Sequence, residues 1–188
     1  MKELFVGMLF VFLDVNIGIQ NHILDMLPDF VGYLLMQRGL GKLSEESRYF
    51  EKALPVVMGM TVYSVVLYVM DIMATTVHAR FVSFCLGLAA MVCSLLIGFW
   101  IVSGVRDMER SRGWNLEGEK LHSMWLCSAV IQCIAYLCGW IPLVGQIAAV
   151  GAAVMHICFL VAFYQSENLY EAKNDKNPGG FGLRDFFW

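Results

Sequence analysis

Charged residues are scarce in this chain of 188 residues, and that scarcity limits the kind of protein it can be. Only 15% of the residues are Asp, Glu, Lys or Arg, whereas 59% are hydrophobic. A water-soluble domain of this length needs more polar residues, because its surface is large relative to its volume. A lipid bilayer removes that need. The composition therefore predicts an integral membrane protein and argues against a soluble globular domain.

Motifs of catalysis and of cofactor binding are missing as well. The chain has no G-x-x-x-x-G-K-[ST] phosphate loop, no H-E-x-x-H zinc motif and no G-x-S-x-G nucleophile elbow. Its six cysteines lie in apolar segments and none forms a C-x-x-C pair, which argues against a zinc site and a disulfide framework. Basic residues are interspersed with acidic ones, so no nucleic-acid partner is expected. The sequence predicts no catalytic residue, no cofactor and no metal ion.

Long apolar segments are what the chain has instead. A helix that crosses the hydrocarbon core of a bilayer needs about 20 mostly apolar residues. Four segments reach this length, and two shorter ones near the N-terminus carry polar residues. We therefore expect an all-α, polytopic transmembrane helical bundle of about six spans in three hairpins. The expected spans are residues 4–19, 27–42, 54–75, 81–105, 121–140 and 141–165.

The expected spans make up one transmembrane domain, residues 1–166, and a tail follows at 167–188. The first segment resembles a signal peptide only superficially, because it has no Ala-x-Ala cleavage site, and we expect it to be an uncleaved span. The first two spans are ambiguous. They fit either two thin, tilted crossings or a re-entrant hairpin.

Basic residues gather in the linkers on one side of the predicted spans, whereas the other side has only Arg80. Positively charged loops stay in the cytoplasm. We therefore expect both termini and both long linkers to be cytoplasmic and the chain to lie in a plasma membrane, with the lipid bilayer as its immediate partner. The linker residues are Arg38, Lys42, Arg48, Lys52, Arg106, Arg110, Arg112 and Lys120.

The first long linker, LSEESRYFEKALP, is typical of a capped helical turn. Ser44 is the expected N-cap, because its hydroxyl can accept a hydrogen bond from a backbone N–H of the first turn. Glu45 and Glu46 follow directly, where negative charge complements the helix dipole. We therefore expect a helix to begin at this serine.

Polar residues form a line along the third span. Thr61, Ser64, Tyr68 and Asp71 recur at spacings of three and four, so they share one face of a helix, and Val62 and Val66 lie opposite. Such a face either forms hydrogen bonds to neighbouring helices or lines a wet cavity. The first interpretation is favoured.

A polar cluster within the membrane is predicted in the first three spans, with Asp14 near the bilayer centre and Asp25, Asp29 and Asp71 near the outer face. Ionisable groups in a bilayer are costly and often mark a functional site, for example one that holds a hard cation or relays protons. The alternative is structural, because Asp25, Pro28 and Asp29 also fit the beginning of a helix. We favour the structural interpretation. The predicted cluster is Asp14, Asn16, Asp25, Asp29, Ser64, Tyr68 and Asp71.

Small residues form stripes on the fourth and sixth spans. Helices in lipid associate through close backbone approach at small residues, so these stripes are expected to be helix-packing faces. On the sixth span the stripe continues to His156, which we expect to lie too deep to join the polar cluster. The stripes consist of Gly87, Ala90, Ser94, Gly145, Ala149 and Ala152.

The segment LPDFVGYLLMQRGLGKLSEES, preceded by FLDVNIGI, resembles a group of small multi-pass membrane proteins of Clostridia-type bacteria. The similarity extends from Leu4 to Asp71 and includes YVMDI. The group has no assigned activity, so the resemblance implies no catalytic or binding residue. It implies a bacterial plasma membrane.

Two functions agree with these features. The favoured one is a non-enzymatic membrane protein that packs with another copy of itself or with another membrane protein, as the small-residue stripes suggest. The alternative is a small proton- or cation-coupled transporter or channel subunit that uses Asp14 and the face formed by Thr61, Ser64, Tyr68 and Asp71. An intramembrane enzyme is supported only by the carboxylates near the outer face.

Overall fold

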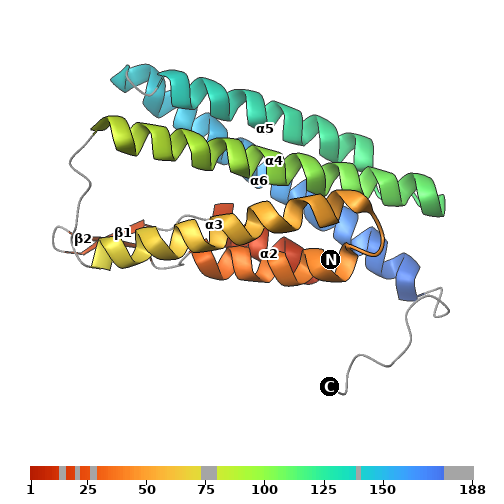
Figure 1. Ribbon diagram of the computed structural model, residues 1–188. Coiled ribbons are helices and arrows are strands. Elements are labelled where there is room, and N and C mark those ends of the chain that lie inside the picture. Colours follow the sequence, from red (N-terminus) through yellow and green to blue (C-terminus); the bar gives the residue numbers. More distant parts are fainter. Residues whose placement is uncertain (13–15, 20–21, 26–28, 73–79, 139–140, 176–188) are drawn as a thin grey trace.

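The described part of the chain is a bundle of six helices with one short two-stranded hairpin (Figure 1). The computed structural model describes residues 1–12, 16–19, 22–25, 29–72, 80–138 and 141–175. The all-α architecture is therefore confirmed. The helices are α1 (Lys2–Phe12), α2 (Asp29–Leu43), α3 (Arg48–Ile72), α4 (Arg80–Arg112), α5 (Gly118–Cys138) and α6 (Pro142–Asp175), and the strands are β1 (Asn16–Ile19) and β2 (His22–Asp25).

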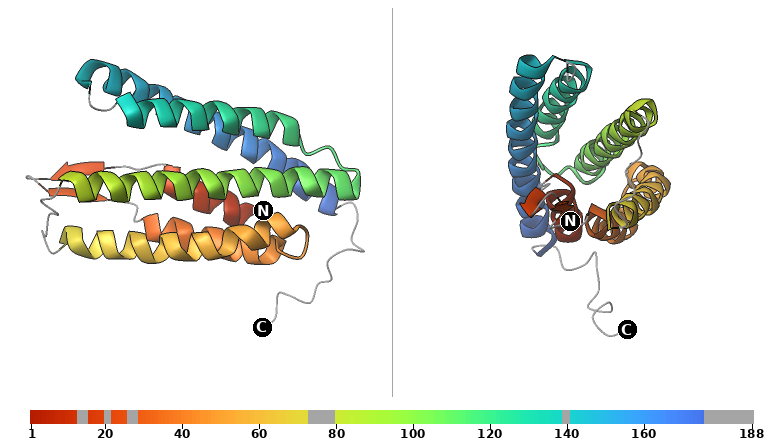
Figure 2. Two further views of the ribbon diagram at one scale, coloured as in Figure 1. Left: turned by 45° about the horizontal axis from the view of Figure 1, so that its top comes forward. Right: turned by 90° about the vertical axis from the view of Figure 1, so that its left-hand side faces the viewer.

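Each helix packs against the next along the chain, and α6 returns to α1, so the six form a ring around a common axis (Figure 2). The ends of the ring differ. At one, which we call the polar end, α1 begins and α6 ends, and the Lys2 Nζ atom lies 3.0 Å from a carboxylate oxygen of Glu171. At the other, the hairpin end, α3 ends and α4 begins, and β1 and β2 lie at this end on the side of α6 (Figures 1 and 2).

Four of the described helices are long and apolar enough to cross a membrane: Arg48–Met70, Phe84–Arg112, Gly118–Cys138 and Leu143–Asn174. The first two helices differ from them. With 11 and 15 residues, α1 and α2 are about 16 and 22 Å long at 1.5 Å per residue, shorter than the hydrocarbon core of about 30 Å. Of the six helices, only α3 to α6 are thus long enough to cross a membrane.

The first predicted span, residues 4–19, is not a continuous helix. Helix α1 ends at Phe12, and β1 then pairs antiparallel with β2 in the register Asn16↔Asp25 and Ile19↔His22. The sequence DVNIGI explains the difference, because its apolar residues alternate with polar ones or glycine and so have the period of a strand. The first two segments are therefore joined through a hairpin of strands.

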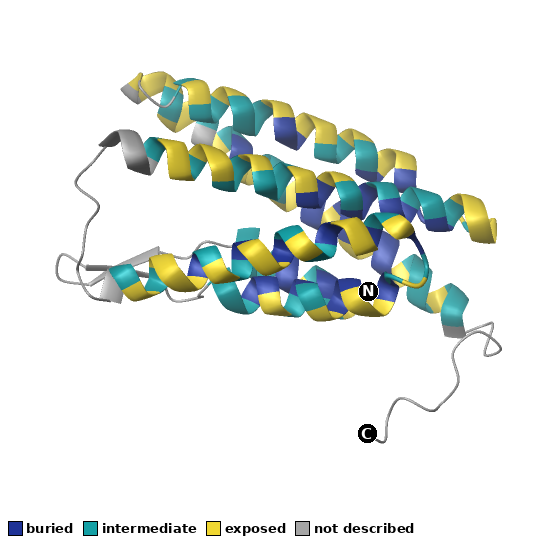
Figure 3. Cartoon of the chain, in the orientation of Figure 1, coloured by how far each residue is buried: buried dark blue, intermediate teal, exposed yellow. Residues whose placement is uncertain are grey.

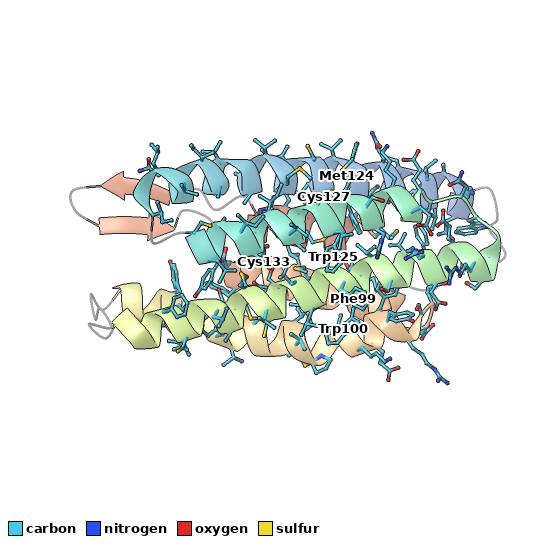
Figure 4. All side chains as sticks on the ribbon, turned by 90° about the horizontal axis from the view of Figure 1, so that it is seen from above. Phe99, Trp100, Met124, Trp125, Cys127 and Cys133 are labelled. Carbon is cyan, nitrogen blue, oxygen red and sulfur yellow. The ribbon has the colours of Figure 1, made fainter. Side chains whose placement is uncertain are left out.

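Dense packing is concentrated in the polar half of the bundle (Figure 3). Large side chains with no exposed surface come from α1, α2, α3, α4 and α6 near that end and from the linker between α4 and α5. The rings of Phe99 on α4 and Trp125 on α5 lie beside one another there, with centroids 5.5 Å apart (Figure 4). The fully buried side chains include Leu4, Leu40, Phe50, Val105, Met108, Leu116 and Phe163.

Ser47, rather than the predicted Ser44, caps α3. The Ser47 Oγ atom accepts a hydrogen bond of 3.3 Å from the backbone N–H of Tyr49, and its hydroxyl donates one of 2.6 Å to Asp107 of α4. The hydroxyl of Ser44 instead donates to the backbone carbonyl of Gly41 at 2.8 Å. The prediction of Ser44 was wrong because α2 continues to Leu43, which leaves Ser44 in the turn that ends this helix.

The short helices α1 and α2 are in backbone contact. A Cβ atom on Gly7 would lie 2.6 Å from the backbone nitrogen of Met36, and one on Gly32 would lie 2.8 Å from the carbonyl oxygen of Gly7. A Cβ atom on Gly39 would lie 2.7 Å from the backbone nitrogen of Leu4. These three glycines therefore allow the approach that small residues permit between membrane helices. Their role in packing was not predicted.

We expect Gly32→Ala to separate α1 from α2. The added methyl group overlaps backbone atoms of α1, which can move away only if the whole helix shifts. The free energy of unfolding should therefore fall by about 1–3 kcal/mol. Gly41→Ala on the same helix is the control, because a Cβ atom there meets nothing within 4 Å. Thermal unfolding in detergent checks the pair, and equal melting temperatures would contradict the contact.

Ser47→Ala should also destabilise the protein, because it removes both the cap of α3 and the bond to Asp107. The expected loss is about 1–2 kcal/mol. Ser44→Ala removes only a local bond in an exposed turn and should change the unfolding free energy by less than about 0.5 kcal/mol. The reverse order in denaturant titrations would restore Ser44 as the cap.

Candidate functional site

A cavity of about 720 Å³ lies among the helices in the hairpin half of the bundle, and every helix contributes to its wall. It is open rather than fully enclosed. Its lining residues come from the end of α1, the beginning of α2, the second half of α3, the first half of α4, the end of α5 and the first half of α6. The wall includes Val11, Phe12, Asp29, Tyr33, Met60, Tyr63, Ser64, Leu67, Gly87, Ala90, Met91, Ser94, Gln132, Ala135, Tyr136, Ala152, Ala153 and His156.

Five polar side chains interrupt this mainly apolar wall: Asp29, Ser64, Ser94, Gln132 and His156. Each comes from a different helix, α2 to α6 in order. Asp29 is the first residue of α2, a position where a carboxylate complements the helix dipole. Polar groups of both hydrogen-bonding types thus surround a single space.

Aromatic rings form much of the remaining wall. The ring of Phe12 stacks on that of His156, with centroids 4.7 Å apart and planes inclined by 16°. The hydroxyl of Tyr136 donates a hydrogen bond of 2.6 Å to the backbone carbonyl of Phe84, which holds α5 to α4 beside the cavity. A Cβ atom on Gly87 would lie 3.2 Å from that hydroxyl, so this glycine leaves room for the tyrosine.

The cavity is closed toward the polar end. Met8, Met36, Ile97 and Ile101 lie next to the lining residues on that side, and each is at most 4% exposed. They border only a small void of about 10 Å³, so no wide passage continues along the axis among the described residues. The cavity is therefore closed on this side.

The structure brings together part of the predicted polar cluster. Asp29 and Ser64 line the cavity, and Ser64 is 9% exposed whereas Val62 on the opposite face of α3 is 65% exposed. Tyr68 packs edge-on against Phe30 at 5.5 Å. Asp14 lies outside the described residues. So do the side chains of Asn16, Asp25 and Asp71, whose backbones belong to β1, β2 and α3.

His156 also joins this site, contrary to the expectation that it lies too deep. The prediction was wrong because it assumed that all six helices have the same length. Helix α1 ends at Phe12, so its last turn meets the middle of α6, where His156 lies. Phe12 at the end of α1 therefore contacts His156 in the middle of α6.

Several predicted packing residues face the cavity. Ala90, Ser94 and Ala152 belong to its wall, as does Gly87 beside Tyr136. Gly145 lies in the first turn of α6, where its N–H donates to the carbonyl of Ile141 at 2.8 Å, and the side chain of Ala149 lies outside the described residues. The small side chains on α4 therefore leave space in the bundle.

The aromatic lining residues were not predicted. Tyr33, Tyr63 and Tyr136 lie in apolar segments, where single tyrosines give no pattern of their own. A signal exists on α5, because Gln132 and Tyr136 are four residues apart and so share a face. Among the residues that the structure describes, no group of three His, Cys, Asp or Glu side chains is placed to hold a metal ion.

Tyr136→Phe tests the contact between α4 and α5. Without its hydroxyl the carbonyl of Phe84 loses a donor, and we expect the unfolding free energy to fall by about 1 kcal/mol. Tyr164→Phe is the control, since this tyrosine is 49% exposed on the outside of α6. Thermal unfolding of the two variants in lipid nanodiscs should separate them. An unchanged Tyr136→Phe variant would show that the bond contributes nothing.

The site thus rests on residues from all six helices, and comparison with known proteins adds no assignment to it. No protein-family model matches the chain, and neither a curated protein nor a solved structure is similar to it.

Proposed function

We propose that this chain is an integral membrane protein that binds a small amphipathic molecule in its central cavity, as a solute-binding or transport component. The observation that carries the proposal is a single cavity of about 720 Å³ with a contribution from each of the six helices. Chance packing defects in a bundle are small, because protein interiors are close-packed. A space of this size is a ligand-sized one.

The volume and the wall both agree with a ligand site. Small-molecule sites are typically about 300–1,000 Å³, lined mainly by apolar and aromatic groups with a few polar groups that orient the ligand. Phe12 and Tyr63 represent the first kind of group, and Gln132 and Asp29 the second. A molecule with an apolar body and one or two polar substituents matches this wall.

The cavity favours this function over one based on helix packing alone. Ala90 and Ser94, which were expected to pack against another helix, both line the cavity, and Ala90 also packs against the buried core. Closure toward the polar end is expected of a protein that takes up its ligand from the hairpin end. It corresponds to one state of an alternating-access cycle or to a capture component.

The proposed location is the plasma membrane of a bacterium, with the polar end in the cytoplasm. Basic residues of the polar end, such as Lys42, Arg106 and Arg112, support this orientation through the positive-inside rule. The resemblance of residues 4–71 to membrane proteins of Clostridia-type bacteria supports the same location. The hairpin end then faces outward.

The test is ligand binding by the purified full chain in nanodiscs. A panel of small amphipathic molecules is screened for thermal stabilisation, because a ligand at 100 times its dissociation constant stabilises by about 2.7 kcal/mol. Mass spectrometry of molecules that copurify with the chain gives a second readout. Failure of every compound to stabilise the chain, with nothing copurified, would refute the proposal.

Two adjacent alanines provide a matched control. Ala90 lines the cavity, whereas Ala89 is exposed on the outside of α4. Ala90→Trp should weaken the binding of a stabilising molecule by about tenfold or more, since the indole occupies ligand space. Ala89→Trp should leave binding unchanged. Equal affinities in isothermal titrations of the two variants would place the ligand elsewhere.

A further inference from the structure

We infer that the cavity selects organic cations with aromatic or bulky apolar groups. This inference rests on the proposed function and names the chemical class of its ligand. It is drawn from the charges and the rings of the wall rather than from the cavity's size. Both point to the same kind of molecule.

Among the described lining residues, the one side chain with a formal charge is acidic. Asp29 is the one carboxylate among the described lining residues, and this lining contains no Lys or Arg. The only described lining side chain that can become basic is His156, and its ring is stacked on that of Phe12. In a site of low dielectric constant, a carboxylate favours a ligand that carries positive charge. An anionic ligand would meet no compensating charge on this wall.

The rings of the wall also favour a cation. Phe12, Tyr33, Tyr63 and Tyr136 line one space, and the face of an aromatic ring attracts positive charge within about 6 Å of its centroid. The ring faces attract apolar groups as well, so a cation with its own rings is held at both its charge and its body. Asp29 and the rings therefore act together.

The test uses two probes of the same shape and opposite charge, tetraphenylphosphonium and tetraphenylborate. Their binding to the full chain in nanodiscs is measured by equilibrium dialysis, with binding to protein-free nanodiscs subtracted. We expect saturable binding of the phosphonium, tighter than that of the borate by about tenfold or more. Borate binding that equals or exceeds phosphonium binding would overturn the inference, as would the absence of saturable phosphonium binding.

Asp29→Asn identifies the group that carries the selectivity. Asparagine has nearly the shape of aspartate, so α2 should remain folded, whereas the charge is lost. The preference for the phosphonium should fall toward unity in this variant and return in Asp29→Glu. An unchanged preference in a folded Asp29→Asn variant contradicts the assignment. If that variant does not fold, the comparison of the two probes on the wild-type chain decides.

The outcome also separates this inference from the proposed function. Suppose that a neutral or anionic molecule stabilises the chain and that Ala90→Trp weakens its binding. This result would refute cation selectivity and leave the cavity as a ligand site. If Ala90→Trp weakens the binding of no molecule, whatever its charge, both proposals fail. Phosphonium binding that depends on Asp29 and Ala90 together supports both.

Discussion

The backbone contact between α1 and α2 is the constraint on which the rest of the structure depends. Neither helix is long enough to cross a bilayer alone, so neither can be held in place by lipid in the way that α3 to α6 can. Gly7 and Gly32 join them into one unit instead. That unit closes the ring between α3 and α6, and it places Phe12 and Asp29 at the same level of the cavity wall.

The two halves of the bundle have different tasks. At the polar end, glycines on α4 receive large rings: a Cβ atom on Gly104 would lie 2.6 Å from the ring of Phe50, and one on Gly98 would lie 2.7 Å from Trp125 Nε1. This interlocking makes the polar half dense. In the hairpin half, the small residues of α4 face space. The dense half thus fixes the helices whose other ends line the cavity.

The sequence predicted the helical class, the four long helices and the inward polar face of α3, because each follows from composition or from a period of 3.6 residues. It did not predict that Ser47 caps α3 or that His156 meets Phe12, because both depend on where a neighbouring helix ends. The glycines of α1 and α2 were missed for a similar reason. In the sequence, a glycine that faces outward cannot be told from one that contacts a second backbone. Gly59 is of the first kind, because a Cβ atom there would meet nothing within 4 Å.

The unequal lengths of the helices have a consequence for the membrane itself. Helix α6 has 34 residues and is about 51 Å long, whereas α1 beside it is about 16 Å long. Lipid cannot match both at one thickness, and a bilayer relieves such a mismatch by thinning next to the short element and by tilting the long one. A bilayer around this bundle would therefore be thinner beside α1 than beside the long helices. Such thinning would bring headgroups and water closer to Phe12, where α1 ends in the cavity wall.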